Sequence, residues 1–216
     1  MRGEKAVLRD GSVVLIREVE AEDAPLLADG FTRLSDESRQ LRFLTGKPNL
    51  TAAELRYFTH IDHHDHEALG AINPEDGRGV GIARYIRDAK DPEAAEVAVT
   101  VVDEWQRRGL GTELLDRLAD RARQEGIRHF TALVGADNDA VVGLLEEGAL
   151  GVHVIKRESS AVEYTIELPA RGLGDALHEI LRAFGRRQVG FSQSTRHTPA
   201  ASARGHLTTD HDDSDG

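Results

Sequence analysis

The sequence predicts one α/β domain of the α+β type, in which helices flank a central mixed sheet that is mostly antiparallel. Two short β-prone runs surround Asp10-Gly11, and Asp-Gly pairs are typical of hairpin turns. Between Glu96 and Val134 a strand, a helix and a second strand follow one another, which indicates one parallel crossover. Two further β-prone runs, 151–156 and 162–168, close the fold as a strand pair.

The other elements are predicted from apolar spacing and helix caps. Apolar residues on one side predict a helix within Glu20–Leu34, and Ser35 can cap a short helix that runs to Phe43. Thr51 and Glu54 have the spacing of a capping box, which starts another helix. The same patterns predict strands at 68–73, 80–87 and 96–102, and helices at 110–124 and 138–147.

The chain is expected to divide into four parts. Residues 12–169 form the domain, and residues 1–11 form an N-terminal hairpin arm. Residues 170–187 carry an amphipathic helix, because apolar side chains recur there at helical spacing. Residues 188–216 contain almost no large apolar side chains and are expected to be a disordered tail.

Composition excludes several classes of protein. The 216 residues include no cysteine, which rules out disulfides, thiolate nucleophiles and cysteine zinc sites. The formal net charge of -11 argues against general nucleic-acid binding and favours a cationic or amine substrate. No apolar run is long enough to cross a bilayer, so we expect a soluble, cytoplasmic protein without a membrane partner.

The chemistry centres on the turn between the strand 96–102 and the helix 110–124. Its two glycines permit close backbone approaches, and the first N–H groups of the helix have no partner inside the helix. The helix dipole adds positive character, so the turn is expected to hold a phosphate or pyrophosphate. Neither the lysine-bearing phosphate loop nor the GxGxxG dinucleotide fingerprint fits this stretch.

A β-branched strand, a Gln-Arg-Arg-Gly-Leu-Gly turn, a long amphipathic helix and a later asparagine resemble the acetyl-coenzyme A motif of the GNAT N-acetyltransferases. The resemblance implies acetyl-CoA as acyl donor and a twisted sheet of six to seven strands, splayed at the cofactor, with about four helices. It also implies that the pantetheine arm bonds backbone groups of the strand and that the turn holds the pyrophosphate. The implied cofactor-binding residues are Val99, Val101, Val102, Gln106, Arg107, Arg108, Gly109, Leu110, Gly111, Thr112 and Asn138.

Several segments are most similar to the catalytic domain of bacterial protein lysine acetyltransferases of the Pat type, among them LRDGSVVLIREV and AEVAVTVVDEWQRRGLG. This resemblance implies protein lysine side chains as acceptors, with acyl-CoA synthetases among the targets. Two alternatives stay open: acetylation of a small amine such as a polyamine, aminoglycoside or amino acid, and a non-catalytic acyl-CoA-binding module. The sequence does not select an oligomeric state or a preference between acetyl and propionyl groups.

Glu96 is the candidate catalytic residue. A protonated lysine, with a pKa of about 10.4, cannot attack a thioester, so a base must remove its proton. Glu96 lies in a strand of otherwise apolar and small residues, and in related lysine acetyltransferases a glutamate of the corresponding strand acts as general base. Many GNAT enzymes also use a tyrosine to protonate the leaving thiolate, but residues 143–147 contain none.

The run from His60 to His66 is the rival site, because histidine and aspartate can bind divalent metals. Adjacent residues rarely converge on one ion, and the run has no His-x-x-x-His pair of the helical type. We therefore predict no metal site and interpret the run as a polar loop near the substrate entrance.

Overall fold

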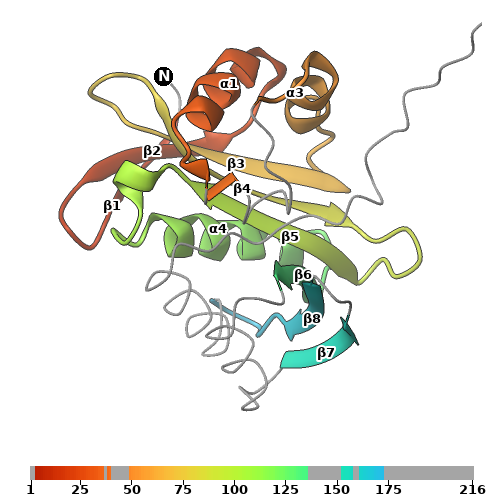
Figure 1. Ribbon diagram of the computed structural model, residues 1–216. Coiled ribbons are helices and arrows are strands. Elements are labelled where there is room, and N and C mark those ends of the chain that lie inside the picture. The colour runs from red at the N-terminus through yellow and green to blue at the C-terminus, as the bar shows by residue number, and fades with distance from the viewer. Residues whose placement is uncertain (1–2, 37, 40–48, 136–151, 158–160, 173–216) are drawn as a thin grey trace, which may run out of the picture.

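The computed structural model describes residues 3–36, 38–39, 49–135, 152–157 and 161–172 (Figure 1). Its α-helices are α1 (Ala24–Thr32), α3 (Ala52–Thr59) and α4 (Leu110–Gln124), with short 3-10 turns η1 (Ala21–Asp23) and η2 (Asp103–Trp105). Its strands are β1 (Glu4–Val7), β2 (Val13–Glu18), β3 (His66–Ile72), β4 (Gly79–Arg87), β5 (Ala94–Val101), β6 (His129–Gly135), β7 (Val152–Arg157) and β8 (Ala161–Glu167). These elements confirm the predicted order of helices and strands within the described part of the chain.

All the strands belong to one eight-stranded sheet in the order β1-β2-β3-β4-β5-β6-β8-β7. Neighbouring strands are antiparallel except β5 and β6, which the α4 crossover makes parallel. The predicted mixed, mostly antiparallel sheet is therefore confirmed. Its count of eight exceeds the expected six to seven because β1 pairs with β2, with Val7 opposite Val13, and so extends the same sheet.

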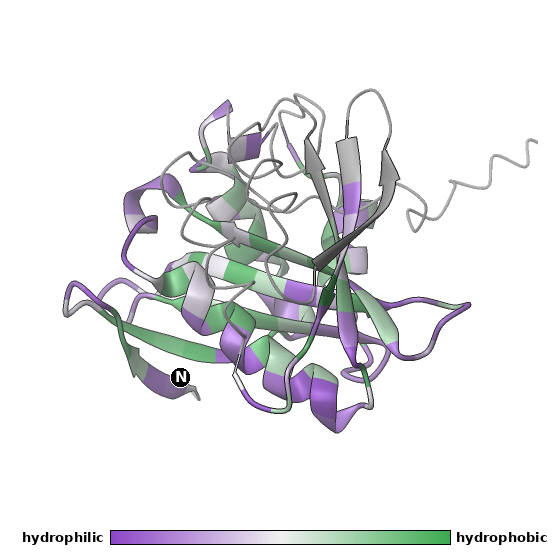
Figure 2. Cartoon of the chain, turned by 90° about the horizontal axis from the view of Figure 1, so that it is seen from below, coloured by the Kyte–Doolittle hydropathy of each residue, from purple (hydrophilic) through white to green (hydrophobic). Residues whose placement is uncertain are grey.

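Helices cover both faces of the sheet. In Figure 1, α1 and α3 lie on one face and α4 lies on the other. The apolar face of α4 is buried against the sheet through Leu110, Leu114, Leu115, Leu118, Ala119 and Ala122. Figure 2 shows hydrophilic residues on the outward side of α4, where Glu113 and Arg117 form the predicted pair at 2.9 Å. Burial of one face and charge on the other fix the orientation of this helix.

A close approach at Gly81 seats α4 on the sheet. A Cβ built at Gly81 would lie 3.1 Å from side-chain carbons of both Leu110 and Leu114, which is tighter than ordinary packing. Because Gly81 has no side chain, the N-terminal turn of α4 can pack directly against β4. This contact places the start of α4 beside the end of β5, where the candidate site lies.

The capping box predicted at Thr51 is also confirmed. The Thr51 hydroxyl accepts the backbone N–H of Glu54 at 3.3 Å, and the Glu54 carboxylate accepts the N–H of Thr51 at 2.8 Å. These bonds satisfy two donors at the start of α3. The cap thereby fixes where α3 begins over the sheet.

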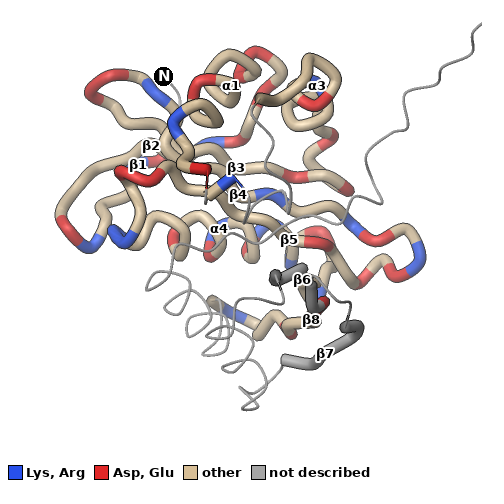
Figure 3. The backbone as a smooth tube through the Cα atoms, viewed as in Figure 1, with Lys and Arg blue, Asp and Glu red and all other residues tan. Residues whose placement is uncertain are grey.

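Charged residues of both signs are spread over the tube in Figure 3, so the net charge of -11 does not gather on one described element. None of the helices that the structure describes is long and apolar enough to cross a membrane. The predicted helices at 138–147 and within 170–187 and the predicted tail at 188–216 lie outside the described residues. Only part of the helix predicted from Ser35 to Phe43 is described.

Candidate active site

The parallel strands β5 and β6 pair over only three residues each. Ala94 to Glu96 pair with His129 to Thr131, after which β5 runs on to Val101 without a partner on that edge among the described residues. The two strands thus stop pairing directly beyond Glu96. This is the splay that the sequence resemblance implies at an acetyl-CoA site.

The unpaired edge of β5 exposes backbone groups of Val99 and Val101. The N–H of Val102 donates to the carbonyl of Val80 in β4 at 3.0 Å, so even-numbered residues of β5 direct their backbone groups toward β4. Because these directions alternate along a strand, Val99 and Val101 direct theirs toward the splayed side. Both backbone groups of Val102 have partners within the protein, because its N–H bonds Val80 and its carbonyl accepts the N–H of Trp105 at 2.8 Å.

Gln106 closes the end of this edge. Its carboxamide nitrogen donates to the carbonyl of Val101 at 3.0 Å and to the hydroxyl of Ser38 at 3.2 Å. Ser38 in turn donates to Asp103 at 3.0 Å, which ties the segment after α1 to the turn before α4. Gln106 therefore holds the turn against the strand through its side chain.

The turn before α4 leaves the N–H groups at the start of that helix facing outward. Gly109 is the N-cap residue with φ of 92°, in the left-handed region, and no side chain caps the helix. The first bond into the helix runs from the N–H of Glu113 to the carbonyl of Gly109 at 3.1 Å. The amides of Leu110, Gly111 and Thr112 precede it and have no acceptor inside the helix, which suits an anionic ligand.

Gly111 keeps the space over the strand edge open. A Cβ built there would lie 3.8 Å from Val101 and 4.0 Å from Val99, which are ordinary contacts. Packing against the described residues therefore does not require glycine at this position. The missing side chain instead leaves room for a ligand to approach both the amides of α4 and the edge of β5.

The two arginines of the turn have different surroundings. Arg107 is exposed and has a positive φ of 61°, so it is held in a strained turn with its charge toward solvent. Arg108 is bound within the protein: it donates to Ser12 at 3.2 Å and stacks 4.9 Å from the ring of Trp105. Arg107 is thus the more available charge for a phosphate.

Glu96 lies where the splay begins, half-buried, with its side chain on the face that α1 and α3 cover. The side chains of Val99 and Val101 lie on the opposite face, toward Gly111 of α4, and side chains alternate faces along a strand. Thr100, four residues after Glu96, lines a pocket beneath α1. Side chains separated by an even number of residues lie on the same face of a strand, so Glu96 is on the face of that pocket. The carboxylate and the free strand edge are therefore neighbours on one strand.

Sequence reasoning missed two residues beside Glu96, Arg84 and Tyr57. Arg84 is only 2% exposed, and its guanidinium lies 5.1 Å from the ring of Tyr57 and donates to His66. The charge of Glu96 acts on the Tyr57 hydroxyl, whose pKa is raised mainly by burial. An arginine in the middle of the otherwise apolar strand 80–86 was the signal that could have revealed this cluster.

A pocket of about 830 Å³, including its open mouth, lies between α1, α3 and the sheet. Most of its lining is apolar, and it reaches Phe58, Arg84 and Thr100. It thus lies on the same face as Glu96. An acceptor could approach the splay from this side of the sheet.

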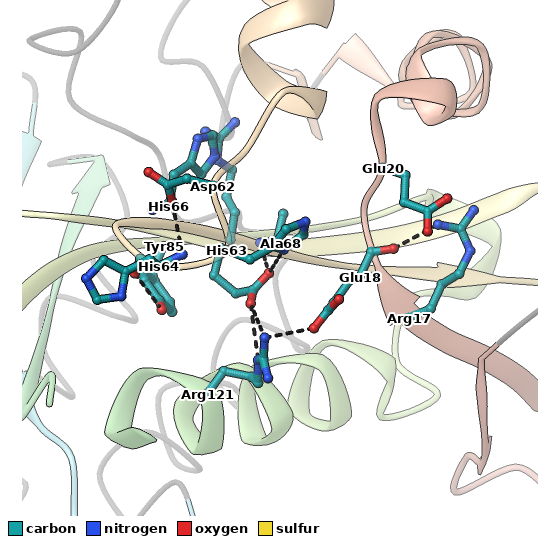
Figure 4. A network of polar contacts seen from close by, with 12 residues as sticks. Arg17, Glu18, Glu20, Asp62, His63, His64, His66, Ala68, Tyr85 and Arg121 are labelled. Carbon is teal, nitrogen blue, oxygen red and sulfur yellow. Dashed lines mark hydrogen bonds and ion pairs between the residues drawn. The ribbon is translucent and has the colours of Figure 1, made fainter. Parts of the chain in front are cut away.

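Among the described residues, the histidine run touches this site only through its last residue, His66, which accepts an N–H group of Arg84. His63 contacts Glu67 at 2.8 Å, His64 contacts Glu125, and the carboxylate of Asp62 accepts the N–H of His66 at 2.9 Å. These contacts tie the loop to β3 and to the C-terminal part of α4, as Figure 4 shows in part. In the part of the chain that the structure describes, the loop therefore connects β3 to the end of α4.

The same network contains the side chains best placed to hold a metal. Ligand atoms of Glu18, His63 and Glu67 lie within 4.8 Å of one another. However, the guanidinium of Arg121 lies among them, 2.7 Å from Glu18 and 3.0 Å from the buried Glu67 (Figure 4). Arg121 supplies the positive charge there, so the arrangement is an ion-pair cluster.

Comparison with known proteins decides the family. Residues 33–151, more than half of the chain, match the model of the acetyltransferase (GNAT) family. The chain belongs to the GNAT acetyltransferase family. Its sheet, splayed after Glu96 and followed by a helix without a side-chain cap, is accordingly the fold of a family that uses acetyl-CoA.

Several GNAT relatives are similar in sequence or structure. Acetyltransferase PA5475 of Pseudomonas aeruginosa is 36% identical over 136 residues, covering 62% of this chain and 73% of the relative. Acetyltransferase Pat of Mycolicibacterium smegmatis is 29% identical over 163 residues, but the 75% of this chain that aligns spans only 48% of that protein. The crystal structure of the GNAT domain of S. lividans PAT has a TM-score of 0.67 at 32% identity, covering 77% of this chain and 97% of that domain.

Glu96 and the turn lie at the two ends of the unpaired edge of β5, whereas Asn138 lies outside the described residues. Residues 143–147, where the GNAT tyrosine is missing from the sequence, also lie outside them. The described part of the site consists of the edge of β5, the start of α4 and the cluster around Glu96.

Proposed function

We propose that this GNAT acetyltransferase transfers acetyl from acetyl-CoA to lysine side chains of proteins, with Glu96 as general base. The observation that carries the proposal is the position of Glu96. It is the last residue of β5 that pairs with β6, and the unpaired edge suited to the acyl donor begins directly after it. A carboxylate at this point can meet both the donor and an amine that arrives from the α1 and α3 face.

In the proposed reaction, Glu96 accepts a proton from the lysine ammonium, directly or through a water molecule. The neutral nitrogen attacks the thioester carbon and forms the C–N bond, the nitrogen loses a second proton to solvent, and the C–S bond breaks. The products are an N-acetyl lysine and the coenzyme A thiolate, which takes up a proton from solvent. The N–H of Val99 faces the splayed side and is our candidate to stabilise the developing oxyanion.

For the donor we propose that the pantetheine arm bonds backbone groups of Val99 and the N–H of Val101, whose carbonyl already accepts from Gln106, and that the pyrophosphate lies on the amides of the turn. The outward N–H groups of residues 110–112 and the exposed charge of Arg107 support this arrangement. Because the backbone of Val102 is already bonded to Val80 and Trp105, its contribution to the arm would be limited to side-chain contact. Asn138 stays a proposed contact to the arm.

Similarity to the Pat acetyltransferases supports a protein acceptor, at 29% identity for the mycobacterial relative and 32% for the S. lividans domain. By the same reasoning acyl-CoA synthetases are the first targets to test. Acetylation of a small amine is the alternative that uses the same donor residues.

Glu96→Gln tests the catalytic part of the proposal. It should lower kcat/KM about 10²- to 10⁴-fold because proton transfer is lost. Its Kd for acetyl-CoA, measured by calorimetry, should not change. Glu93→Gln is the matched control, since Glu93 is an exposed carboxylate just before β5 and pairs with Arg128 at 2.9 Å. Wild-type turnover in Glu96→Gln would remove Glu96 from the mechanism.

Product analysis tests the acceptor. The protein is incubated with labelled acetyl-CoA and either a protein lysate or a panel of free amines, and products are identified by mass spectrometry. Acetylated lysines in lysate proteins are expected. Labelling confined to free amines would instead favour the small-molecule reaction, and acetyl-CoA binding without any transfer would indicate a non-catalytic module.

A further inference from the structure

Arg84 is an unusual residue for its place in the fold. It lies in the middle of β4, the strand between β3 and β5, and is 2% exposed. A buried guanidinium is costly unless its surroundings stabilise the charge. Its position beside Glu96, rather than in a surface ion pair, suggests a role in the reaction.

The strand register places Arg84 next to Glu96. Arg84 is opposite Ala98 in β5, and Glu96 is opposite Ile86, so Arg84 and Glu96 are diagonal neighbours on the same face. Ala98 and, in β3, Ala68 flank Arg84 on that face. These small side chains leave room for the guanidinium to lie along the sheet toward its diagonal neighbours.

The guanidinium is held in place from three sides. Its central carbon lies 5.1 Å from the ring of Tyr57 and 4.5 Å from the ring of Phe58, both in α3. From β3, His66 accepts one of its N–H groups. Cation–π contacts of this kind stabilise a cation that has lost part of its water. Arg84 is therefore a fixed positive charge, and α3 is the element that fixes it.

The surroundings of Glu96 make this charge matter. Among the described residues, the titratable groups on its face are Arg84 from β4, Tyr57 from α3 and His66 from β3, while β6 contributes Thr131 opposite Glu96. His66 is neutral, because burial and then the charge of Arg84 lower its pKa to about 3. Tyr57 is neutral as well, because burial raises its pKa. Within this described set, Arg84 thus supplies the positive charge.

We infer that Arg84 is a positioning residue, whose buried positive charge, diagonal to Glu96 on the same face of the sheet, holds the carboxylate of Glu96 in its ionised form. The inference rests on the proposed role of Glu96 as general base. Without Arg84, partial burial would favour the protonated carboxyl, which cannot accept a proton from the substrate. Tyr57 and Phe58 contribute indirectly, because their rings hold the guanidinium of Arg84 in place.

The pH dependence of kcat/KM tests the inference with three variants. Arg84→Met replaces the charge by an apolar side chain of similar length, and Arg84→Lys restores the charge. Arg123→Met is the control, because Arg123 is a partly buried arginine of α4, on the other side of the sheet from Arg84, and donates to the carbonyl of Gly172 at 3.0 Å. Folding is checked by circular dichroism and by the Kd for acetyl-CoA, which none of the variants should change.

In Arg84→Met the acidic limb of the plot of kcat/KM against pH should move to higher pH by about one unit. A nearby opposite charge changes the pKa of a carboxyl by about that amount. Below the limb, kcat/KM should therefore fall about tenfold. Arg84→Lys should move the acidic limb most of the way back to its wild-type pH, and Arg123→Met should leave the limb where it is in the wild type. A limb that does not move in Arg84→Met, or that moves equally in Arg84→Lys, overturns the inference.

Glu96→Gln, measured in parallel, separates the two proposals. If it retains full transfer, the role of Glu96 fails and the inference for Arg84 falls with it. If Glu96→Gln is inactive while Arg84→Met keeps the wild-type profile, the base stands and only the role of Arg84 is refuted.

Discussion

The two glycines of the turn should respond in opposite ways to the same substitution. Gly109 has a φ of 92°, and a Cβ there would lie 3.1 Å from Cγ of Arg9, a side chain that can move aside. The cost of Gly109→Ala is therefore mainly the left-handed backbone, about 1–2 kcal/mol of unfolding free energy. For a domain of this size that lowers Tm by about 2–8 °C.

Gly111→Ala should not destabilise the protein. Its Cβ would make ordinary contacts, 3.8 Å to Val101 and 4.0 Å to Val99, at a position inside α4. Replacing a helical glycine by alanine reduces the entropy of the unfolded chain, which stabilises by about 0.4–1 kcal/mol. The new methyl group would nevertheless fill the space that we assign to the donor, so the Kd for acetyl-CoA should rise at least about tenfold, or 1.4 kcal/mol.

Urea unfolding and calorimetric titration with acetyl-CoA check both variants. Two results would refute the assignment of the donor site to the edge of β5 and the start of α4. One is a Gly111→Ala protein that binds acetyl-CoA as tightly as the wild type. The other is a Gly111→Ala protein less stable than Gly109→Ala, which would mean that the space is needed for packing.

Two further predictions concern the network of Figure 4 and its neighbour His66. Glu67→Gln should lower the unfolding free energy by about 2–3 kcal/mol. This is less than the usual cost of breaking a buried ion pair, because the Arg121 side chain is 36% exposed and its charge can turn to solvent. Glu113→Gln on the outer face of α4 should cost less than about 1 kcal/mol, and equal urea midpoints for the two variants would contradict this. Burial, followed by the charge of Arg84, lowers the pKa of His66 to about 3, so the stability that this residue contributes is complete above pH 6.5 and declines as the pH falls toward 3. His66→Gln should therefore lose less unfolding free energy between pH 7 and pH 5 than the wild type, and an equal loss would show that His66 is not the group responsible.

Much of the fold could be predicted because its signals are local. The capping box at Thr51, the Asp-Gly hairpin and the amphipathic pattern of Leu110 to Gln124 each depend on residues within a few positions of one another. The strand, the glycine turn and the helix of the donor site are likewise consecutive in the chain. Such features are written into short stretches, so the sequence alone indicated both the GNAT fold and the region of the candidate site.

Other features depend on strand register and could not be inferred from spacing. The side chain of Gln106 bonds Val101 and Ser38, a residue 68 positions away, and the predicted contact of Gln106 with the donor stays a prediction. The histidine run is another example: the sequence did not indicate that His63 contacts Glu67 or that His64 contacts Glu125, and the interpretation of the run as a polar loop near the substrate entrance stays a prediction. A long-range partner leaves no local pattern in the chain.

The sequence by itself indicated the GNAT family and, through that resemblance, acetyl-CoA as donor and Glu96 as candidate base, because the strand, the glycine turn and the helix start of the motif lie within one continuous stretch. Only the tertiary structure decided what surrounds that carboxylate. Arg84 and Tyr57 are 12 and 39 positions from Glu96 in the chain. The antiparallel register of β4 and β5 places Arg84 on the face of Glu96, and the packing of α3 on that face places Tyr57 beside Arg84. Side chains from separate elements become neighbours through packing, and packing depends on the whole core rather than on any single segment.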